Sequence, residues 1–489
     1  MNRWTHTVGA TVVAVVLGTG LVAMAPAASP AVGAGSLSAD PVGSTPSGGV
    51  TSIQMTPPAL SVPVRDLLPG GDGGSAAGAA PQRVNPLADT ADQGAGGTRN
   101  RANVPSDPLI VGRPSTRAAV RTPATNLVFD GTGNPLGCGT CSPPDTTGDV
   151  GPNHYIQLVN ATKVAIYNKS GVLLKPAFDL STLFSSLGGA CYANDRGDPQ
   201  VLYDPLADRW LLSQFTPKGA NTLCFAISQT SDPLGAYYLY SFATPDFPDY
   251  FKVGVWPTGY YVGDNESTYA AYALDRTKML AGLPATAVRV GDQTNLLMPA
   301  DVDGTTAPSS AGGLFYTFKS KNYAPHSVPT DRLEVFQMTP DFSAGTAAFS
   351  TIATLPVTPF TFTVCGFMVF VCVPQKDTAQ KVDSVSEWPM QRFAYRKLAD
   401  RETLVGNFTV GGGTAAPGAA IRWFELGNTG SGWTLRQEGT QDLGDGLNRW
   451  MGSIAMDADG NIALAGEPRF NSAAGVVVET MVALVLARA

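Results

Sequence analysis

The chain has 489 residues and a formal net charge of −7, and only 15% of its residues are charged. Its Lys and Arg residues form no cluster, which excludes a nucleic-acid or anionic-membrane partner, because both require concentrated positive charge. The 54 glycines and 38 prolines predict frequent turns and few long charged helices.

The N-terminus has the pattern of an export signal. A short basic start leads into an apolar run from Val8 to Met24, and small residues follow at 25–28. The run is shorter than the roughly 20 apolar residues that a membrane span needs. We therefore predict a signal peptide at 1–27, a secreted protein that is extracellular or associated with the cell wall, and no membrane span after signal removal.

Residues 28–125 are rich in Gly, Pro, Ala and Ser and show no sustained period of 2 or 3.6 residues. Such a segment buries too little apolar surface to offset the entropy cost of ordering, so we predict a disordered linker. Two short apolar pieces, 60–64 and 109–111, are candidates for isolated edge strands that dock onto the following domain.

Residues 126–489 carry a repeated β pattern. Strand-like runs such as 223–228 and 333–338 alternate with Asp-, Gly-, Asn- and Pro-rich turns, and units return about every 50 residues. This predicts an all-β domain, a propeller-like repeat of antiparallel sheets with about six to seven blades. Strand spacing alone does not separate this fold from a β-sandwich array, which is the alternative. Helices are expected only at 275–280 and 180–187.

The last blade is predicted to be incomplete. After residue 464 the chain enters a Gly-containing stretch and a Val-rich run with little polar alternation. A missing outer strand leaves unpaired backbone at a sheet edge. We expect 470–489 to be loosely packed or to be patched onto the first blade.

Six cysteines follow the predicted signal peptide. In an oxidising compartment an even count predicts three disulfides, for which 15 connectivities are possible. Local pairing is favoured, because the cysteines lie in three near pairs: Cys138 and Cys141, Cys191 and Cys224, and Cys365 and Cys372.

Five motifs of the chain form a recognisable set: PPDTTGDVGPNHY from Pro143, NDRGDP from Asn194, DRWLLSQF from Asp208, DYFKVGVWP from Asp249 and RWMGSIAMD from Arg449. Taken together they resemble those of a group of uncharacterised secreted bacterial proteins of β-propeller type. The resemblance covers about residues 127–465 and implies fold and export, while no activity is agreed for the group. Arg196 and the residues after Leu464 depart from the pattern.

Acidic residues in two blade-opening loops form the candidate metal site. Closely spaced hard oxygen ligands on loops are what Ca²⁺ takes, six to eight at a time. The alternative is that these side chains cap turns by accepting hydrogen bonds from backbone N–H groups. The candidate ligands are Asp145, Asp149, Asn194, Asp195 and Asp198.

Carboxylate pairs at the centre of a propeller could also hydrolyse a glycoside, one as acid and the other as base or nucleophile. Nucleophilic triads are not indicated, because only His154 and His326 follow the signal and the chain has no Gly-x-Ser-x-Gly motif. The candidate carboxylates are Asp145, Asp195, Asp198 and Asp264, with Arg392 or Arg449 as anion clamps.

Two functions follow from these observations. The first is a secreted recognition or adhesion module that binds an extracellular glycan or protein as a monomer. The alternative is a secreted polysaccharide-active hydrolase that uses carboxylates at the propeller mouth. Tryptophans in repeated motifs, such as Trp210 and Trp450, are expected to wedge between blades and not to bind ligand.

Overall fold

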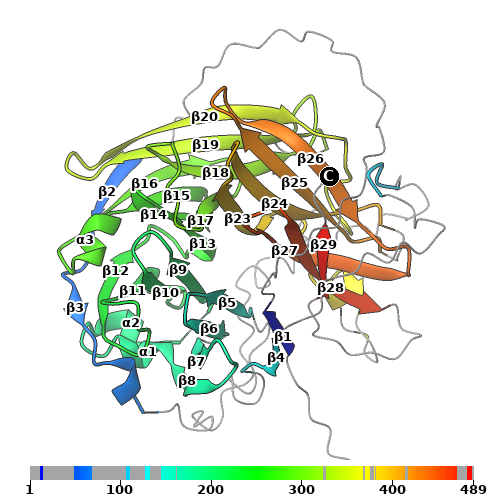
Figure 1. Ribbon diagram of the computed structural model, residues 1–489. Helices are drawn as coiled ribbons and strands as arrows, with labels where there is room; N and C mark the ends of the chain where they lie inside the picture. Colours follow the sequence, from blue (N-terminus) through cyan, green and yellow to red (C-terminus); the bar gives the residue numbers. More distant parts are fainter. Residues whose placement is uncertain are drawn as a thin grey trace, which may run out of the picture.

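The computed structural model is almost entirely β-structure, as predicted, with its sheets arranged around one centre (Figure 1). The residues that it describes are 11–14, 49–68, 106–110, 127–132, 145–470 and 482–486, apart from 161, 196, 323–325, 367–368, 370, 375–378, 380 and 414–416. None of the helices in these segments has the length and apolar character needed to span a membrane.

Six blades of antiparallel strands follow one another along the described chain. Blade 1 has β5 (Thr147–Val150), β6 (His154–Val159), β7 (Lys163–Asn168) and β8 (Leu173–Asp179); blade 2 has β9 (Gln200–Asp204), β10 (Arg209–Phe215), β11 (Thr222–Ser228) and β12 (Tyr237–Ala243). Blade 3 has β13 (Asp249–Trp256), β14 (Gly259–Asn265), β15 (Tyr269–Leu274) and β16 (Thr286–Gln293); blade 4 has β17 (Met298–Asp303), β18 (Gly313–Lys319), β19 (Arg332–Asp341) and β20 (Thr346–Pro356). Blade 5 has β23 (Pro389–Lys397), β24 (Glu402–Val410), β25 (Ala420–Asn428) and β26 (Thr434–Gln441); blade 6 has β27 (Leu447–Met456), β28 (Ile462–Phe470) and β29 (Val482–Leu486).

The first strand of each blade lies nearest the centre, and the later strands step outward (Figure 1). These inner strands contact one another in order, β5 with β9, β9 with β13, β13 with β17, β17 with β23 and β23 with β27. The pair β17 and β23 is hydrogen-bonded in parallel, with Ala300 opposite Phe393, which joins blades 4 and 5 into one sheet. This radial order is that of a β-propeller and not of a sandwich array.

Hydrophobic cores fill the spaces between neighbouring blades. Leu202 and Phe225 of blade 2 pack with Val253 and Tyr272 of blade 3 in one cluster, and similar clusters join blades 1 and 2 and blades 5 and 6. Both faces of a blade are therefore buried, which explains the imperfect polar–apolar alternation of the strands. Trp210 and Trp450 are each 1% exposed, so the prediction that they are core residues is confirmed.

Two segments of the predicted linker dock onto the propeller. β2 (Val50–Gln54) adds to the outer edge of β16, and β3 (Ala59–Leu60) adds to β12, with the single-turn 3₁₀ helix Val64–Asp66 following. Ile110 forms a parallel bridge with Thr440 at the edge of blade 5. The edge docking predicted for 60–64 and 109–111 is found at Leu60 and Ile110, whereas the strand at 50–54 was not predicted. The description of 28–125 as disordered is wrong for 49–68 and 106–110.

The last blade has three described strands, where the others have four or five. Its outer strand β29 pairs with β28, with Leu484 opposite Leu464, and so belongs to blade 6. The predicted patching of the C-terminus onto the first blade is not found for residues 482–486. Before blade 1 in the chain, β1 (Thr11–Ala14) pairs with β4 (Leu127–Asp130) in a separate two-stranded sheet.

Smaller elements and crosslinks complete the described fold. The two helices expected from sequence are present as α1 (Leu180–Leu183) and α3 (Arg276–Leu280), and α2 (Gly189–Ala193) and the short hairpin β21 (Val373–Pro374) and β22 (Lys381–Val382) were not predicted. Disulfides join Cys191 to Cys224 and Cys365 to Cys372, as predicted. The third pair, Cys138 and Cys141, lies outside the described residues.

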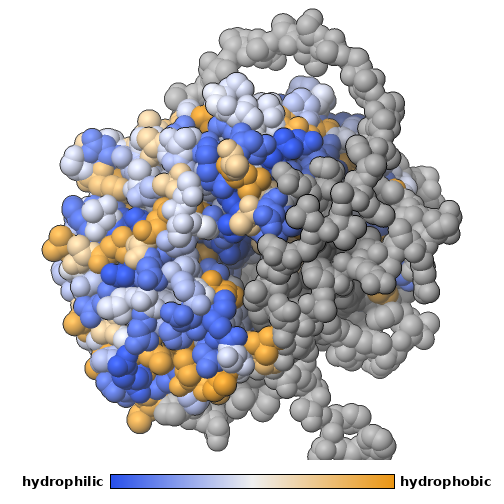
Figure 2. Space-filling model, in the orientation of Figure 1, coloured by the Kyte–Doolittle hydropathy of each residue, from blue (hydrophilic) through white to orange (hydrophobic). Residues whose placement is uncertain are grey.

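The outer surface mixes polar and apolar groups. Large apolar side chains with high exposure include Leu68, Val172 and Tyr192, which belong to different segments of the chain. Figure 2 shows apolar residues in several separate groups among polar ones on the described part of one face. Scattered exposed apolar groups are ordinary for a folded protein and indicate no particular partner.

Candidate functional site

Three acidic residues stand where the inner strands of consecutive blades begin. Asp145 lies two residues before β5, Asp198 lies two residues before β9, and Asp249 is the first residue of β13. These strands are neighbours in the ring, and the charge of Asp198 acts on both Asp145 and Asp249, so the three strand starts lie at the same end of the propeller centre. The charges of all three carboxylates act on Lys252, which also lies on β13, and oppose the lowering of its pKa by burial. We call Asp145, Asp198, Asp249 and Lys252 the axial cluster.

The backbone at these strand starts is held in an uncommon conformation. Asp145, Asp198 and Tyr250 have φ angles of 37°, 44° and 51°, in the left-handed region that residues other than glycine rarely adopt. Such a conformation costs about 1–3 kcal/mol per residue and persists where the surrounding structure enforces it, often at functional sites. Its recurrence at the start of three successive blades indicates that the placement of these side chains is constrained.

The three carboxyl groups differ in the charges that act on them. Burial and the charge of Asp198 raise the pKa of Asp145 to about 7 and that of Asp249 to about 8. Burial alone raises the pKa of Asp198, and the ammonium of Lys252 is the largest opposing influence on all three groups. Because the charge of Asp198 raises the pKa of the other two, Asp198 is the group that ionises first as the pH rises.

An aromatic pair adjoins the cluster. The Tyr250 hydroxyl donates to the Pro389 carbonyl at 3.2 Å, and its ring lies 4.7 Å from that of Trp388. The Lys252 ammonium lies 3.9 Å from the centre of the Tyr250 ring and donates to the Phe251 carbonyl at 3.1 Å. The start of β23 thus lies at the same end of the ring as the carboxylates.

The cluster is open to solvent. Asp145, Asp198 and Asp249 are each only partly buried, so solvent still reaches them.

A second charged group lies deeper along the inner strands. Arg392 of β23 pairs with Asp149 of β5 at 3.6 Å and with Asp301 and Asp303 of β17, the last at 2.7 Å. We call these four residues the Arg392 hub. Asp149 is four residues beyond Asp145, up to about 13 Å along an extended chain. Since blades 1, 4 and 5 all contribute, the hub bridges the ring centre below the axial cluster.

The hub is also rich in carboxylate. Burial raises the pKa of Asp301 to about 7 even though Arg392 opposes the shift. Burial raises the pKa of Asp149 as well, against the effect of Arg392 and of the Tyr203 backbone N–H, which donates to its Oδ2 atom at 2.8 Å. One guanidinium does not neutralise three carboxylates, and Arg392 is therefore committed to the hub and not free to clamp a substrate anion.

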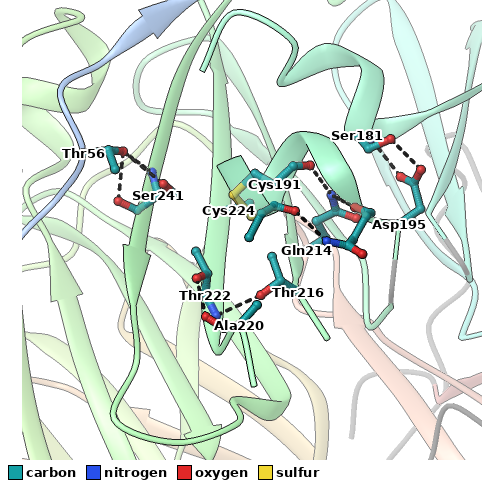
Figure 3. Close-up of a disulfide and its surroundings, with 12 residues drawn as sticks. Thr56, Ser181, Cys191, Asp195, Gln214, Thr216, Ala220, Thr222, Cys224 and Ser241 are labelled. Atoms are coloured by element: carbon teal, nitrogen blue, oxygen red, sulfur yellow. Dashed lines mark hydrogen bonds between the residues drawn. A yellow bond between two sulfur atoms is a disulfide. The ribbon is translucent and has the colours of Figure 1, made fainter. Parts of the chain in front are cut away.

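The predicted calcium ligands do not come together. Asp195 accepts a hydrogen bond from Thr162 Oγ1 at 2.5 Å and another from Ser181 Oγ at 2.6 Å, and Figure 3 shows the second of these. The Asn194 side chain donates to the Ala190 carbonyl at 3.1 Å. Asp149 belongs to the hub, and only Asp145 and Asp198 meet. Within the described segments no group of three or more His, Cys, Asp or Glu side chains is arranged to hold a metal ion. The five-ligand prediction is wrong as a set, because two of its members anchor the loop around α2 and not the ring centre.

Only part of the predicted catalytic set lies in the axial cluster. Asp145 and Asp198 belong to it, whereas Asp195 is structural. Arg449 is paired with Asp445, with Nη2 and Oδ2 2.6 Å apart.

Asp264, another predicted catalytic residue, lies near the end of β14. It is fully buried, and both of its carboxylate oxygens lack a hydrogen-bond partner. Burial and the charge of Glu266 raise the pKa of Asp264 well above its ordinary value, and Asp249 adds to the shift.

Asp249 and Lys252 were not among the predicted site residues. Both lie in the DYFKVGVWP stretch, which was noted only for its resemblance to other proteins. The available signal was positional, because Asp249 opens the third blade as Asp145 and Asp198 open the first two.

Comparisons with known proteins give distant likenesses. No protein-family model matches the chain, and no curated protein matches its sequence. Among solved structures it is similar to Bacteroides ovatus xyloglucan PUL GH43B (9% identity, TM-score 0.28, 66% of this chain and 48% of that one). It is also similar to 1,3Gal43A, an exo-β-1,3-galactanase from Clostridium thermocellum (10%, 0.29, 68% and 73%), and to Cellvibrio cellulosa α-L-arabinanase (9%, 0.29, 66% and 86%). This chain spans about half the length of the first of these. At such values the similarity carries no function, and the propeller assignment rests on the strand pairing above.

Proposed function

We propose that the protein is a secreted glycoside hydrolase acting on an extracellular polysaccharide, with its chemistry at the axial cluster. The observation that supports this is that Asp145, Asp198 and Asp249 lie at the starts of three neighbouring inner strands and that the charge of Asp198 raises the pKa of the other two, to about 7 and about 8. Glycoside hydrolysis needs one carboxyl group that holds a proton at neutral pH and a second that is ionised.

The electrostatics suggest the roles. Asp198, whose negative charge Lys252 stabilises, serves as the ionised base or nucleophile. Asp249, whose pKa of about 8 lies above the value of about 7 for Asp145, serves as the acid that protonates the departing sugar oxygen. Asp145 is held by the side-chain amide of Asn160, which donates to its Oδ2 at 2.9 Å, and it is the reserve candidate for the acid.

A recognition or adhesion module is the competing function, and it needs no such arrangement. A sugar hydroxyl is bound well by ordinary ionised carboxylates, amides and aromatic faces. Carboxyl groups crowded until two of them retain protons near pH 7 lower stability and are useful for proton transfer. The disulfides and the absence of a spanning helix in the described segments fit an extracellular protein.

The test is release of reducing sugar from a panel of plant, fungal and bacterial polysaccharides. We expect Asp198→Asn and Asp249→Asn each to lower the rate of the best substrate about 100-fold or more, the usual size of an acid–base contribution. Asp459→Asn, a substitution of an exposed residue in a turn of blade 6, is the matched control and should leave the rate unchanged. Binding without product by the wild-type protein would instead support the recognition module.

A further inference from the structure

Residues 106–110 of the predicted linker are attached to blade 5 mainly through one side chain. Of these five residues only Asp107 is buried, and its carboxylate pairs with Arg422 of β25, with Oδ2 and Nη2 2.6 Å apart. We propose that this segment is a releasable latch, that is, a peptide ligand bound in cis at an aspartate-binding pocket of the propeller. The contact is independent of the hydrolase chemistry proposed above.

The pocket is complete for one carboxylate. Thr440 Oγ1 donates to Asp107 Oδ1 at 2.8 Å and itself accepts a hydrogen bond from Arg422 Nε at 2.8 Å. The Leu109 N–H donates to Asp107 Oδ1 at 2.9 Å, and the Asp107 N–H donates to the Gly412 carbonyl at 3.2 Å. Both carboxylate oxygens therefore have partners, and the Arg422 side chain is only 1% exposed. Charge-assisted contacts of this kind favour a carboxylate over a neutral amide.

The rest of the segment adds little attachment. Ser106 and Pro108 are exposed, and within the described residues 106–110 one bridge joins the segment to a strand, that between Ile110 and Thr440. By contrast, β2 of the same linker pairs with β16 through all five of its residues. A segment that buries little apolar surface gains little from the hydrophobic effect. Its attachment therefore depends on the Asp107 contact.

Arg422 keeps other partners when Asp107 leaves. Its Nη1 donates to the Thr358 carbonyl at 3.0 Å and pairs with Glu438 Oε2 at 3.2 Å. Its guanidinium also lies 5.7 Å from the centre of the Phe360 ring. Breaking a buried ion pair is most costly when the remaining charge is left uncompensated, but here Glu438 still opposes the charge of Arg422. The pocket therefore empties without disrupting the blade.

The latch lies at the end of the propeller that carries the axial cluster. Pro389, whose carbonyl accepts a hydrogen bond from Tyr250, is opposite Phe408. Phe408 is in turn opposite Arg422, which is opposite Thr440, so these residues form one row across blade 5. Since neighbouring strands are about 4.8 Å apart, Arg422 lies about 10 Å outward from β23. The latch thus fixes the linker at the same end of the ring as the carboxylates.

Binding of a fluorescent peptide to the full-length protein tests the latch. The peptide PSDPLIV has the sequence of residues 105–111 and should bind in trans to Asp107→Ala, because the pocket of that variant is empty. In the wild-type protein the cis segment competes at an effective concentration on the order of millimolar, so the peptide should bind at least about tenfold more weakly. The peptide PSNPLIV, which has an amide in place of the carboxylate, should bind to Asp107→Ala about tenfold more weakly than PSDPLIV.

Hydrogen exchange separates a latch from an integral part of the blade. In Asp107→Ala the amides of Leu109 and Ile110 should exchange at least about tenfold faster than in the wild type, whereas the amides of β24 and β25 should keep their protection. Asp66→Ala, at an exposed residue of the other docked linker segment, is the matched control and should change neither peptide binding nor exchange.

Four results would overturn the inference. The first is no binding of PSDPLIV to Asp107→Ala at about 1 mM peptide, the concentration scale of the cis competitor. The second is equal binding of PSDPLIV and PSNPLIV, and the third is equal binding of PSDPLIV to the variant and the wild type, which would place the peptide outside this pocket. The fourth is loss of protection throughout β24 and β25 in Asp107→Ala, which would make Asp107 a core residue of blade 5.

Discussion

The two ends of strand β9 place an aspartate in opposite electrostatic settings. Asp204, at the end of the strand, is fully buried and matched: Arg276 Nε and Nη2 lie 2.7 and 2.9 Å from its two oxygens, and the Tyr260 hydroxyl donates at 3.0 Å. Asp198, just before the strand, shares one ammonium with two further carboxylates. Matched charge holds the blades together, whereas the unmatched charge at the ring centre is available for chemistry or ligand binding.

The largest expected effect is on the matched side. Arg276→Ala leaves the Asp204 carboxylate buried without its partner, and breaking a buried pair in this way costs about 3–5 kcal/mol of unfolding free energy. Denaturant unfolding measures the loss. Arg65→Ala is the control, because its pair with Asp232 is exposed and should contribute about 1 kcal/mol or less. Equal effects of the two substitutions would remove the distinction drawn here.

The next largest effect concerns the disulfide near the unmatched end. Cys191 and Cys224 are 33 residues apart, and the loop from Cys191 to β9 carries Asp195 and Asp198. Replacing both cysteines with Ser should lower the unfolding free energy by about 2–4 kcal/mol. The same change at Cys365 and Cys372, only seven residues apart, should cost less because the closed loop is shorter. A larger loss at the short loop would contradict this ranking.

A smaller effect is the pH dependence of stability. Asp145 and Asp249 have folded-state pKa values of about 7 and about 8, above the ordinary 3.8, so the folded protein binds more protons than the unfolded chain between about pH 4 and 8. Their contribution to the unfolding free energy is fully present below pH 4 and is lost as the pH rises to 8. The loss is at most about 1.4 kcal/mol per pH unit for each group.

Unfolding free energies at pH 5, 6 and 7 check this slope. Asp249→Asn should flatten it, because an amide takes up no proton on folding. Asp459→Asn, at an exposed carboxylate, should leave it as in the wild type. An unchanged slope in Asp249→Asn would mean that the pKa of Asp249 is not raised in the folded protein.

Much of the fold could be predicted from the sequence, because it depends on local rules. Turn residues, strand-forming runs and the 50-residue spacing indicated the propeller, and near cysteines indicated the two described disulfides. The site was predicted in part. Asp195 and Asp198 are three residues apart, yet Asp195 accepts a hydrogen bond from Ser181, whereas Asp198 interacts with Lys252 at the ring centre. That divergence follows from the left-handed backbone at Asp198 and from a contact between distant segments, neither of which periodicity reveals.

The most direct test measures activity and stability on one preparation of Asp198→Asn. The substitution removes one negative charge from a group of carboxylates that share a single ammonium, so the unfolding free energy at pH 7 should stay the same or rise by about 1 kcal/mol. Reducing-sugar release should fall about 100-fold or more in the same sample. Loss of stability together with activity would place Asp198 among the structural carboxylates beside Asp204, and unchanged activity would contradict a catalytic axial cluster.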